Sequence, residues 1–305
     1  MWAPDRLGNI DASHGIEGKC ETIQNKFMKR ALGVRENTST DLILNELNRS
    51  PTWAQWLRQC IGFWNKVVDR KDDDFVKRAL LDNVLVATRD SNKQCWSHGL
   101  LRCIQRLGVI ENFSDILQEN QTSLSKIDPL EIDKGISKIT DFDWQSLSKV
   151  SPRNLDDNQG VGIKSITYAT WMASEDRSHS STYTNLLNNR DDIKCIARLR
   201  LRAHNLNVES GRSNFRSGRI CRCCDKVFDG RRVIEDELHF MLECPLYAED
   251  RVIMFEKLKI EPELVDKDSS MKLVMNPTSF EGWKYLIHFI KKCDKKRTIA
   301  LSSLR

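Results

Sequence analysis

The sequence lacks long apolar runs, internal repeats and a strong excess of either charge. No stretch approaches the roughly 18 consecutive apolar residues that a transmembrane helix needs. The first residues, Met1–Asp5, do not resemble a secretory signal peptide, and no heptad run is long enough for a coiled coil. Of the 305 residues, 40% are hydrophobic and 30% are charged, with a mean hydropathy of −0.50. This composition excludes a low-complexity or disordered chain and is typical of a globular protein of one or two domains.

Motifs of the common enzyme classes are also missing. We find no glycine-rich phosphate-binding loop, no nucleophile elbow and no pair of carboxylates placed at a strand end or turn. The acidic run Asp72-Asp73-Asp74 precedes a predicted helix. Because aspartates favour the positive end of a helix dipole, we expect this run to cap that helix. The sequence therefore predicts that the chain is not an enzyme in its own right.

The net charge of +5 is small, but it is unevenly distributed. Between Lys194 and Arg232, eleven basic residues stand against three acidic ones, so this segment carries +8 and the rest of the chain carries −3. Most of these basic residues are arginines, and arginine suits phosphate because its planar guanidinium forms two parallel hydrogen bonds. The segment is compatible with nucleic-acid binding and also with an ordinary solvated helix face.

Apolar residues recur at helical spacing through most of the chain and predict a mainly α fold. The clearest predicted helices cover residues 16–31, 51–68, 75–86, 96–107 and 191–204. In the second of them, three tryptophans and several aliphatic residues form one broad apolar face, which is typical of a packed core. The stretch from Val161 to Trp171 is ambiguous between strand and helix.

The apolar pattern loosens between about Glu111 and Ser151, where polar residues interrupt short apolar groups. We therefore expect three parts. A helical N-terminal bundle covers residues 1–110, a loosely structured connector covers 111–160, and a C-terminal part covers 161–305. The C-terminal part is predicted to hold the basic helix, a small zinc-stabilised hairpin-plus-helix module and further helices.

Four of the ten cysteines lie close together in the sequence, between residues 221 and 244. The other six are scattered singly and are expected to be small buried hydrophobic residues. Because the chain begins without a signal peptide, the clustered cysteines indicate a metal site rather than disulfides. For the same reason we expect an intracellular protein, in the nucleus or the cytoplasm.

The clustered residues form the pattern C-x2-C-x14-H-x4-C, with Cys221, Cys224, His239 and Cys244 as the candidate ligands. Two cysteines at C-x2-C spacing can bind one metal ion from a single tight turn, and three sulfurs with one imidazole nitrogen suit a closed tetrahedral zinc site. Because the protein fills all four positions, we expect one structural Zn2+ ion and no place for a catalytic water. Cys223, at C-x-C spacing from Cys221, is a competing ligand.

The residues between the two ligand pairs favour a hairpin followed by a helix. Asp229-Gly230 is a typical two-residue hairpin turn. The segments that it would pair are Arg219–Cys224 and Arg231–Ile234. On an uninterrupted helix, His239 and Cys244 would point about 140° apart. They can bind one ion only if the helix ends or bends between them, and Pro245 is placed to do this.

The ligand pattern belongs to a longer motif. Its residues are Arg219, Cys221, Cys224, Glu235-Asp236-Glu237, His239-Phe240, Cys244-Pro245, Tyr247 and Arg251. This motif resembles R-x-C-x2-C followed by E-D-E-x-H-F-x3-C-P-x-Y and an arginine, which is found in the C-terminal region of the reverse transcriptases of non-LTR (LINE-type) retrotransposons. The preceding residues, Arg198–Arg212, resemble that family's R-x3-H-x-L-x-[IV]-E-x-G-R block. Residues 23–51, and Trp64 after them, are similar to the segment that follows the polymerase domain in many such elements.

The resemblance is strongest over residues 198–251 and moderate over 16–70. The chain contains no apolar-flanked Tyr/Phe-x-Asp-Asp and no endonuclease-like set of His, Asp and Asn, so it resembles the C-terminal part of such a protein without the polymerase. A truncated copy, a separate gene model and a domesticated fragment all fit this pattern. The resemblance implies binding of RNA or DNA, mainly through phosphates and beside an upstream reverse transcriptase domain, with no role for a membrane.

The basic residues that lead into the zinc turn are the candidate nucleic-acid contacts. They are Arg198, Arg200, Arg202, His204, Arg212, Arg216, Arg219 and Arg222. The alternating Arg198, Arg200 and Arg202 cannot all share one helix face, so we expect some of them to pair with acids in the N-terminal part. The alternative function is a zinc-stabilised helical protein-interaction module, a domesticated fragment whose arginines meet an acidic partner.

Overall fold

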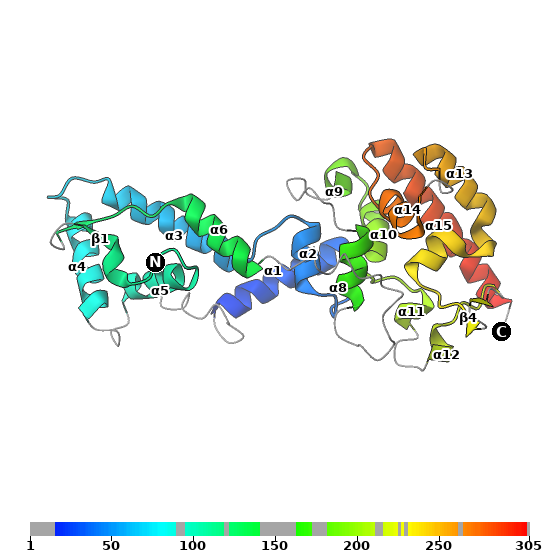
Figure 1. Ribbon diagram of the computed structural model, residues 1–305, viewed down its shortest axis with the longest axis horizontal. Helices are drawn as coiled ribbons and strands as arrows, with labels where there is room; N and C mark the ends of the chain where they lie inside the picture. The colour runs from blue at the N-terminus through cyan, green and yellow to red at the C-terminus, as the bar shows by residue number, and fades with distance from the viewer. Residues whose placement is uncertain are drawn as a thin grey trace. The chain divides into compact units, whose positions relative to one another are not determined.

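The chain is mainly α-helical, as the sequence predicts (Figure 1). The computed structural model describes residues 16–89, 95–118, 122–140, 163–172, 182–210, 216–224, 227–228, 231–261 and 265–303. These residues fold into two compact units that interleave along the chain. The first unit comprises Met1–Lys26 and Ser50–Phe142, and the second comprises Phe27–Arg49 and Asp143–Arg305. The boundaries predicted at residues 110 and 160 do not coincide with this division.

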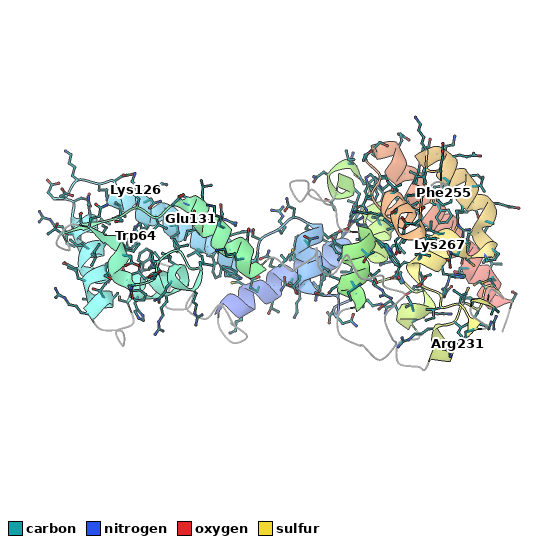
Figure 2. The ribbon with its side chains drawn as sticks, viewed as in Figure 1. Trp64, Lys126, Glu131, Arg231, Phe255 and Lys267 are labelled. Atoms are coloured by element: carbon teal, nitrogen blue, oxygen red, sulfur yellow. The ribbon has the colours of Figure 1, made fainter. Side chains whose placement is uncertain are left out.

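The first unit is built from four full helices and a small hairpin, besides the start of α1. Its elements are α1 (Ile16–Leu32), α3 (Thr52–Val68), α4 (Phe75–Arg89), α5 (Trp96–Arg106), η2 (Phe113–Ile116), β1 (Leu117–Gln118), β2 (Ser123–Leu124) and α6 (Pro129–Thr140). The tryptophan-rich face of α3 lies in the core, as predicted. Trp64, which Figure 2 marks, has no exposed surface. It stacks on Trp96 at 6.5 Å between ring centroids.

Residues 113–118 and 122–140, which the sequence assigned to a loose connector, are folded into the first unit. The Nε1 of Trp64 donates to the carbonyl oxygen of Ser125 at 2.9 Å. Asn65 exchanges two hydrogen bonds with the backbone of Ile127, at 2.8 and 2.9 Å. Asp115 accepts the backbone N–H of Asn112 as part of a capping box. The polar residues that interrupt the apolar pattern thus serve turns and caps, for which hydrophobic periodicity gives no signal.

Helix ends follow the local chemistry of the sequence. Gly33 ends α1 with a φ of +64°, a conformation that glycine adopts without strain. Asp74 caps α4, since its Oδ1 accepts the backbone N–H of Val76 at 2.8 Å. The helix predicted over 191–204 is shorter than expected: Arg202 has a φ of +50°, which ends the helical turn before His204. The ambiguous stretch from Val161 to Trp171 is helical where it is described.

The second unit carries the remaining helices and a two-stranded hairpin. Its elements are α2 (Thr40–Glu46), α8 (Ile163–Thr167), η5 (Tyr168–Met172), α9 (Thr182–Leu186), α10 (Arg190–Arg200), α11 (Asn207–Ser210), α12 (Arg216–Arg219), β3 (Val227–Phe228), β4 (Arg231–Arg232), η6 (His239–Glu243), η7 (Pro245–Tyr247), α13 (Ala248–Leu258), α14 (Lys267–Met275) and α15 (Phe280–Ser302). The long helix α15 packs against α13 and α10 (Figure 1). Its buried face includes Trp283, Phe289 and Cys293.

A buried ion pair ties α2 into this unit. Arg200 and Glu46 are almost completely buried, and the Nε of Arg200 lies 2.5 Å from Glu46 Oε1. The hydroxyls of Tyr168 and Tyr183 donate to the same carboxylate at 2.5 and 2.8 Å. The guanidinium also donates to the carbonyl of Met275 at 2.5 Å. The expectation that an alternating arginine pairs with an N-terminal acid is confirmed at Arg200. The pair also explains why residues 27–49 fold with the second unit.

A second set of ion pairs joins α13 to α15. Asp250 is 5% exposed, and its two oxygens lie 2.7 and 2.5 Å from the Nζ atoms of Lys292 and Lys296. Burial opposes ionisation of Asp250, but the hydrogen bonds and charges of the two lysines outweigh it and hold the pKa of the carboxyl below its usual range. The carboxylate therefore stabilises the folded state above about pH 3.9, its unfolded pKa, and this stabilisation is lost as the pH falls through the folded pKa.

We expect Asp250→Asn to lower the free energy of unfolding by about 1 kcal/mol at pH 7, with the difference from wild type shrinking as the pH falls below about 3.9. Urea unfolding from pH 7 to pH 3 measures this difference. Asp294→Asn, which removes an exposed carboxylate from α15, the helix that carries Lys292 and Lys296, is the control. A difference between Asp250→Asn and wild type that stayed constant over the whole pH range would contradict the assignment.

No helix among the described residues is both long enough and apolar enough to cross a membrane.

Candidate metal centre

Two of the predicted ligands, Cys221 and Cys224, lie on a loop that protrudes from an antiparallel ladder. Ile220 bridges Ile234, and further along β3 pairs with β4. The backbone N–H of Cys221 donates to the carbonyl of Val233 at 2.9 Å, so the ladder fixes the base of the loop. The predicted pairing of Arg219–Cys224 with Arg231–Ile234 is confirmed at one end, where Ile220 meets Ile234. At the other end, β4 pairs with β3 rather than with the predicted segment, and the turn residues Asp229-Gly230 lie outside the described residues.

The other two ligands lie at the ends of one wide helical turn. The backbone N–H of Cys244 donates to the carbonyl of His239 at 2.7 Å, which is the i to i+5 bond of a π-helix. Asp236 accepts the backbone N–H of His239 at 2.7 Å and so caps the start of the turn. Cys244 is already in an extended conformation, and Pro245 begins the next short helix. The predicted bend between His239 and Cys244 is thus confirmed, and it takes the form of a π-turn.

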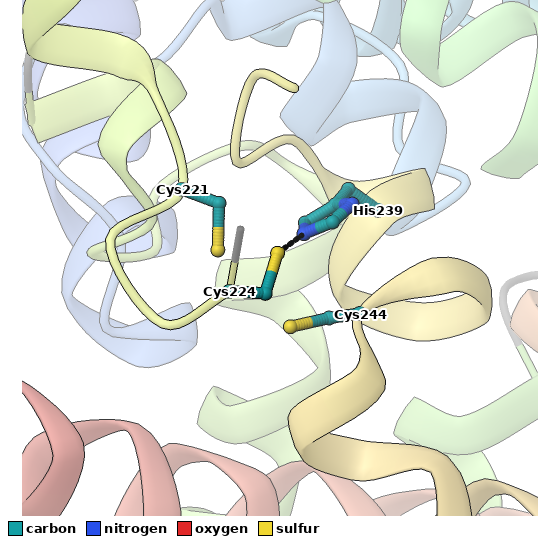
Figure 3. Close-up of side chains that lie close together, drawn as sticks. All are labelled: Cys221, Cys224, His239 and Cys244. Carbon is teal, nitrogen blue, oxygen red and sulfur yellow. Dashed lines mark hydrogen bonds between the residues drawn. The ribbon is translucent and has the colours of Figure 1, made fainter. Parts of the chain in front are cut away.

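The four side chains converge on one point (Figure 3). Their ligand atoms, three sulfurs and one imidazole nitrogen, all lie within 4.8 Å of one another, and Cys221, His239 and Cys244 are buried. The Sγ of Cys224 lies 3.4 Å from the Nε2 of His239. Metal–sulfur bonds of about 2.3 Å in a tetrahedron place the ligand atoms about 3.5 to 3.8 Å apart, so small side-chain adjustments close the set around one ion. These residues could therefore bind one metal ion.

Hydrogen bonds around the sulfurs favour a thiolate at Cys221, whereas the hydrogen bond with Cys221 and burial raise the pKa of the Cys244 thiol. The backbone N–H of Cys223 donates to the Sγ of Cys221, and that of Leu246 donates to the Sγ of Cys244. Side-chain hydrogen bonds from Cys223 and Cys244 lower the pKa of Cys221 far below its usual range. Burial disfavours the imidazolium of His239, but its interactions with Cys221 and with the nearby carboxylate of Glu243 outweigh burial and raise the pKa of His239 to about 10. A cation at the centre would replace these shared protons, so metal binding is expected to release them.

The other imidazole nitrogen of His239, Nδ1, points towards the carboxylate of Glu243. This nitrogen has no hydrogen-bond partner among the described residues and lies 3.7 Å from Glu243 Oε2. Glu243 is in turn paired with Lys267 at 2.8 Å. A carboxylate on the far side of a ligating histidine fixes its orientation and increases its basicity. This arrangement supports Nε2 as the metal-binding atom.

Buried charge pairs surround the candidate centre. The carboxylate of Glu235 is held by two nitrogens of Arg297, each at 2.7 Å. Glu237 lies 2.7 Å from Arg202 Nε and 2.8 Å from His204 Nε2. Arg251 donates to the carbonyls of Met241 and Cys244, at 2.8 and 2.9 Å, and so satisfies the end of the π-turn. The charged residues of the long motif therefore hold the ligand-bearing segments in place.

The structure separates the predicted nucleic-acid contacts into three groups. Arg200 and Arg202 are 3% exposed and matched by carboxylates, so their burial excludes direct contact of these side chains with phosphate in this fold. The imidazole of His204 is likewise mostly buried against Glu237. The prediction of phosphate contacts is wrong for these two arginines because Arg200, at the end of α10, and Arg202, just after it, both face the core, whereas Arg198 is exposed.

The remaining predicted contacts lie at or near the surface. Arg198 and Arg222 are exposed, although the Nε of Arg198 donates to the carbonyl of Gly33 at 2.8 Å. Arg219 is half-buried. Arg212 and the side chain of Arg216 lie outside the described residues.

Two exposed arginines were not among the predicted contacts. Arg231 and Arg232 lie on β4, next to the loop that bears Cys221 and Cys224, and Figure 2 marks Arg231. Arg232 also donates to the carbonyl of Cys224 at 3.2 Å. The signal that could have found them was the predicted hairpin itself, whose short strands cannot bury both faces.

In comparisons with models of known protein families, with characterised proteins and with solved structures, nothing matches this chain.

Proposed function

We propose that the second unit is a zinc-stabilised, non-catalytic nucleic-acid-binding segment of a reverse transcriptase-like retrotransposon protein. The observation that supports it is a closed set of three cysteines and one histidine directly beside a hairpin with exposed arginines. Three thiolates and one imidazole are a common donor set for structural zinc. With four protein ligands the ion has no open position for water or substrate, so its role is to hold the loop and the π-turn together.

The exposed arginines of the hairpin are the proposed phosphate contacts. Arg222 lies on the metal-binding loop itself, and Arg231 and Arg232 lie on the adjoining strand. Arg198, the half-buried Arg219 and the predicted contact Arg212 extend this set. Neutralising several phosphates would make binding depend steeply on salt and little on sequence. The metal would act indirectly, because it fixes the positions from which these guanidinium groups project.

The resemblance to non-LTR reverse transcriptases supports the same proposal from a different direction. The charged residues that carry it lie in the buried pairs around the candidate metal centre, such as Glu235 with Arg297 and Glu237 with Arg202. A motif whose charged residues form such pairs is typical of a module that folds around its metal ion. The arginines that are not part of these buried ion pairs would then contact the nucleic acid.

Replacing Arg222 and Arg231 together with alanine is expected to weaken binding to RNA, single-stranded DNA and duplex DNA alike. The slope of log K against log salt should fall by about 2, one for each lost phosphate contact. Fluorescence anisotropy over a salt series measures both quantities. Arg232 is left intact in this variant because it donates to the carbonyl of Cys224. Alanine at Arg212 and Arg219 is expected to act in the same direction.

The control is Arg102→Ala with Arg106→Ala, which removes the same charge from exposed positions of the first unit. This variant is expected to keep the wild-type salt slope. Equal slopes for the hairpin variant and the wild type would contradict phosphate contact by the hairpin. Binding of an acidic protein in place of nucleic acid would favour the protein-interaction module.

A further inference from the structure

A fourth sulfur, that of Cys223, lies beside the candidate metal centre without belonging to it. The Sγ atoms of Cys221 and Cys223 and a carboxylate oxygen of Glu235 lie within 4.8 Å of one another. The side chains of Cys221 and Cys223 share a hydrogen bond. Cys223 therefore extends the cluster on the side of Cys221 that faces Glu235.

This second group is poorly suited to hold a cation of its own. Both oxygens of Glu235 are taken by Arg297, and Oε2 also accepts the backbone N–H of Asn207 at 2.8 Å. The guanidinium places a positive charge where a metal ion would have to approach. Cys223 is thus a spare thiol next to a metal ligand rather than part of a second site.

The two sulfurs differ in accessibility. Cys221 is 2% exposed, whereas Cys223 is half-buried and reaches the surface. When Cys221 ligates a metal ion, the lone pair of its sulfur is engaged, while the thiol of Cys223 stays free of the ion.

Cys221 and Cys223 are also close enough for a disulfide. Because they are two residues apart, their Cα atoms can be no more than about 7 Å from each other, which lies at the outer limit for a disulfide. A small shift of the loop would close the remaining distance between the sulfurs.

We infer that Cys223 is an oxidation site whose product is a Cys221–Cys223 disulfide, and that forming this bond releases the metal ion. The oxidant is a hydroperoxide such as hydrogen peroxide. It oxidises the Cys223 thiol to a sulfenic acid and is itself reduced to water. The Cys221 thiolate then attacks the Cys223 sulfur, the S–O bond breaks, and hydroxide leaves and takes up a proton from solvent.

The oxidation changes the coordination of the ion. The two sulfurs together give up two electrons to the peroxide. Cys221 no longer ligates, and the ion departs as a hydrated cation. A reducing thiol reverses the reaction by thiol–disulfide exchange. The inference rests on the proposed metal site and is independent of nucleic-acid binding.

The sequence allows the disulfide to be identified directly. Trypsin cleaves after Arg219, Arg222 and Lys226, so Cys221 and Cys223 fall on two adjacent short peptides. We expect peroxide treatment of the full-length protein, with and without prior removal of zinc by a chelator, to leave these two peptides linked until a reductant is added. Mass-spectrometric fragmentation of the linked pair distinguishes Cys223 from Cys224. A bond to Cys224, or no link at all, would overturn the inference.

Zinc release provides a second readout. With a chromogenic zinc indicator, we expect wild type to lose its zinc on peroxide addition and Cys223→Ser to lose it at least about tenfold more slowly. Cys195→Ser, which removes a part-buried thiol outside the cluster, should behave like wild type. Equal rates of zinc release for Cys223→Ser and wild type would contradict the proposal. A chain that bound no zinc would count against the metal site, and the peptide link would still test the disulfide.

Discussion

Cys221→Ser or His239→Ala is expected to unfold the module between residues ~215 and 250 and to abolish stoichiometric zinc binding. A structural site of this class contributes about 10 kcal/mol or more of apparent metal-binding free energy, and this energy is available only to the folded segment. The described β-strands of the module, β3 and β4, are two residues long each, so hairpin pairing alone is too little to hold the loop.

Hydrogen exchange of the full-length protein measures this effect by segment. We expect protection to be lost from the hairpin and the π-turn in both variants, and in wild type after zinc is removed by a chelator. Helices α3 to α5 of the first unit should keep their protection. Because Cys244, Phe240 and Met241 belong to the core of the second unit, neighbouring helices should also become less stable.

The matched control is Cys293→Ser, which changes a fully buried thiol of the same unit that lies outside the cluster. It is expected to lower stability modestly while zinc content stays at one ion per chain. Metal analysis that found much less than one zinc ion in the wild-type protein would remove the basis of the prediction. Unchanged protection of the module in His239→Ala would do the same.

The metal ligands could be predicted from the sequence because their geometry is set locally. The C-x2-C spacing defines one turn, and the conflict between His239 and Cys244 on a regular helix is visible in the helical repeat. Pro245 marks where the helix must end. The sequence indicated a bend but could not specify its form, since a π-turn depends on Asp236 and Arg251 satisfying its two ends.

Arg200 and Arg202 could not be assigned from sequence because the carboxylates nearest to their guanidinium groups are distant along the chain. Arg200 pairs with a carboxylate 154 residues away, and Arg202 with one 35 residues away. Judged by composition alone, the segment from Lys194 to Arg232 is a single basic stretch. The structure divides it into buried arginines that hold the fold together and exposed ones on the hairpin.

The division into two units could not be predicted from the sequence for a related reason. Residues 27–49 contain α2, whose apolar side chains Leu42 and Ile43 lie in the core of the second unit. Hydrophobic periodicity predicts that a helix is amphipathic but does not identify the surface that it covers. Glu46 is a charged residue in a position that such a pattern treats as exposed, although it is 1% exposed in the structure.

Removing one partner of the Glu46–Arg200 pair is expected to destabilise the second unit by about 3 to 5 kcal/mol. In Glu46→Gln, the buried guanidinium keeps its charge and loses its counter-ion, and the hydroxyls of Tyr168 and Tyr183 lose a charged acceptor. Burial and the Glu46 carboxylate raise the pKa of both tyrosines well above its usual range, so these hydroxyls remain donors at every accessible pH.

A double-mutant cycle with Glu46→Gln, Arg200→Met and both together isolates the interaction. Because the double variant leaves no unpaired charge, we expect it to be more stable than either single variant. Asp133→Asn is the surface control. It breaks a pair with Arg58 at 2.7 Å, compared with 2.5 Å for the buried pair, but with 40% and 50% of the two side chains exposed, and it should cost less than about 1 kcal/mol. The free energy of unfolding of each unit, from hydrogen exchange in α10 and α3, measures both.

Equal losses of unfolding free energy in Glu46→Gln and Asp133→Asn would contradict the structural role given to the buried pair.

The same measurement decides how arginine variants are to be interpreted. If Arg200 holds the fold together, a loss of nucleic-acid binding in Arg200→Ala reports unfolding of the second unit and says nothing about phosphate contact. Arg222 and Arg231 have no such buried role, so a change in their salt slope at unchanged stability reports contact alone. The two measurements together separate the arginines that build this unit from those proposed to bind its partner.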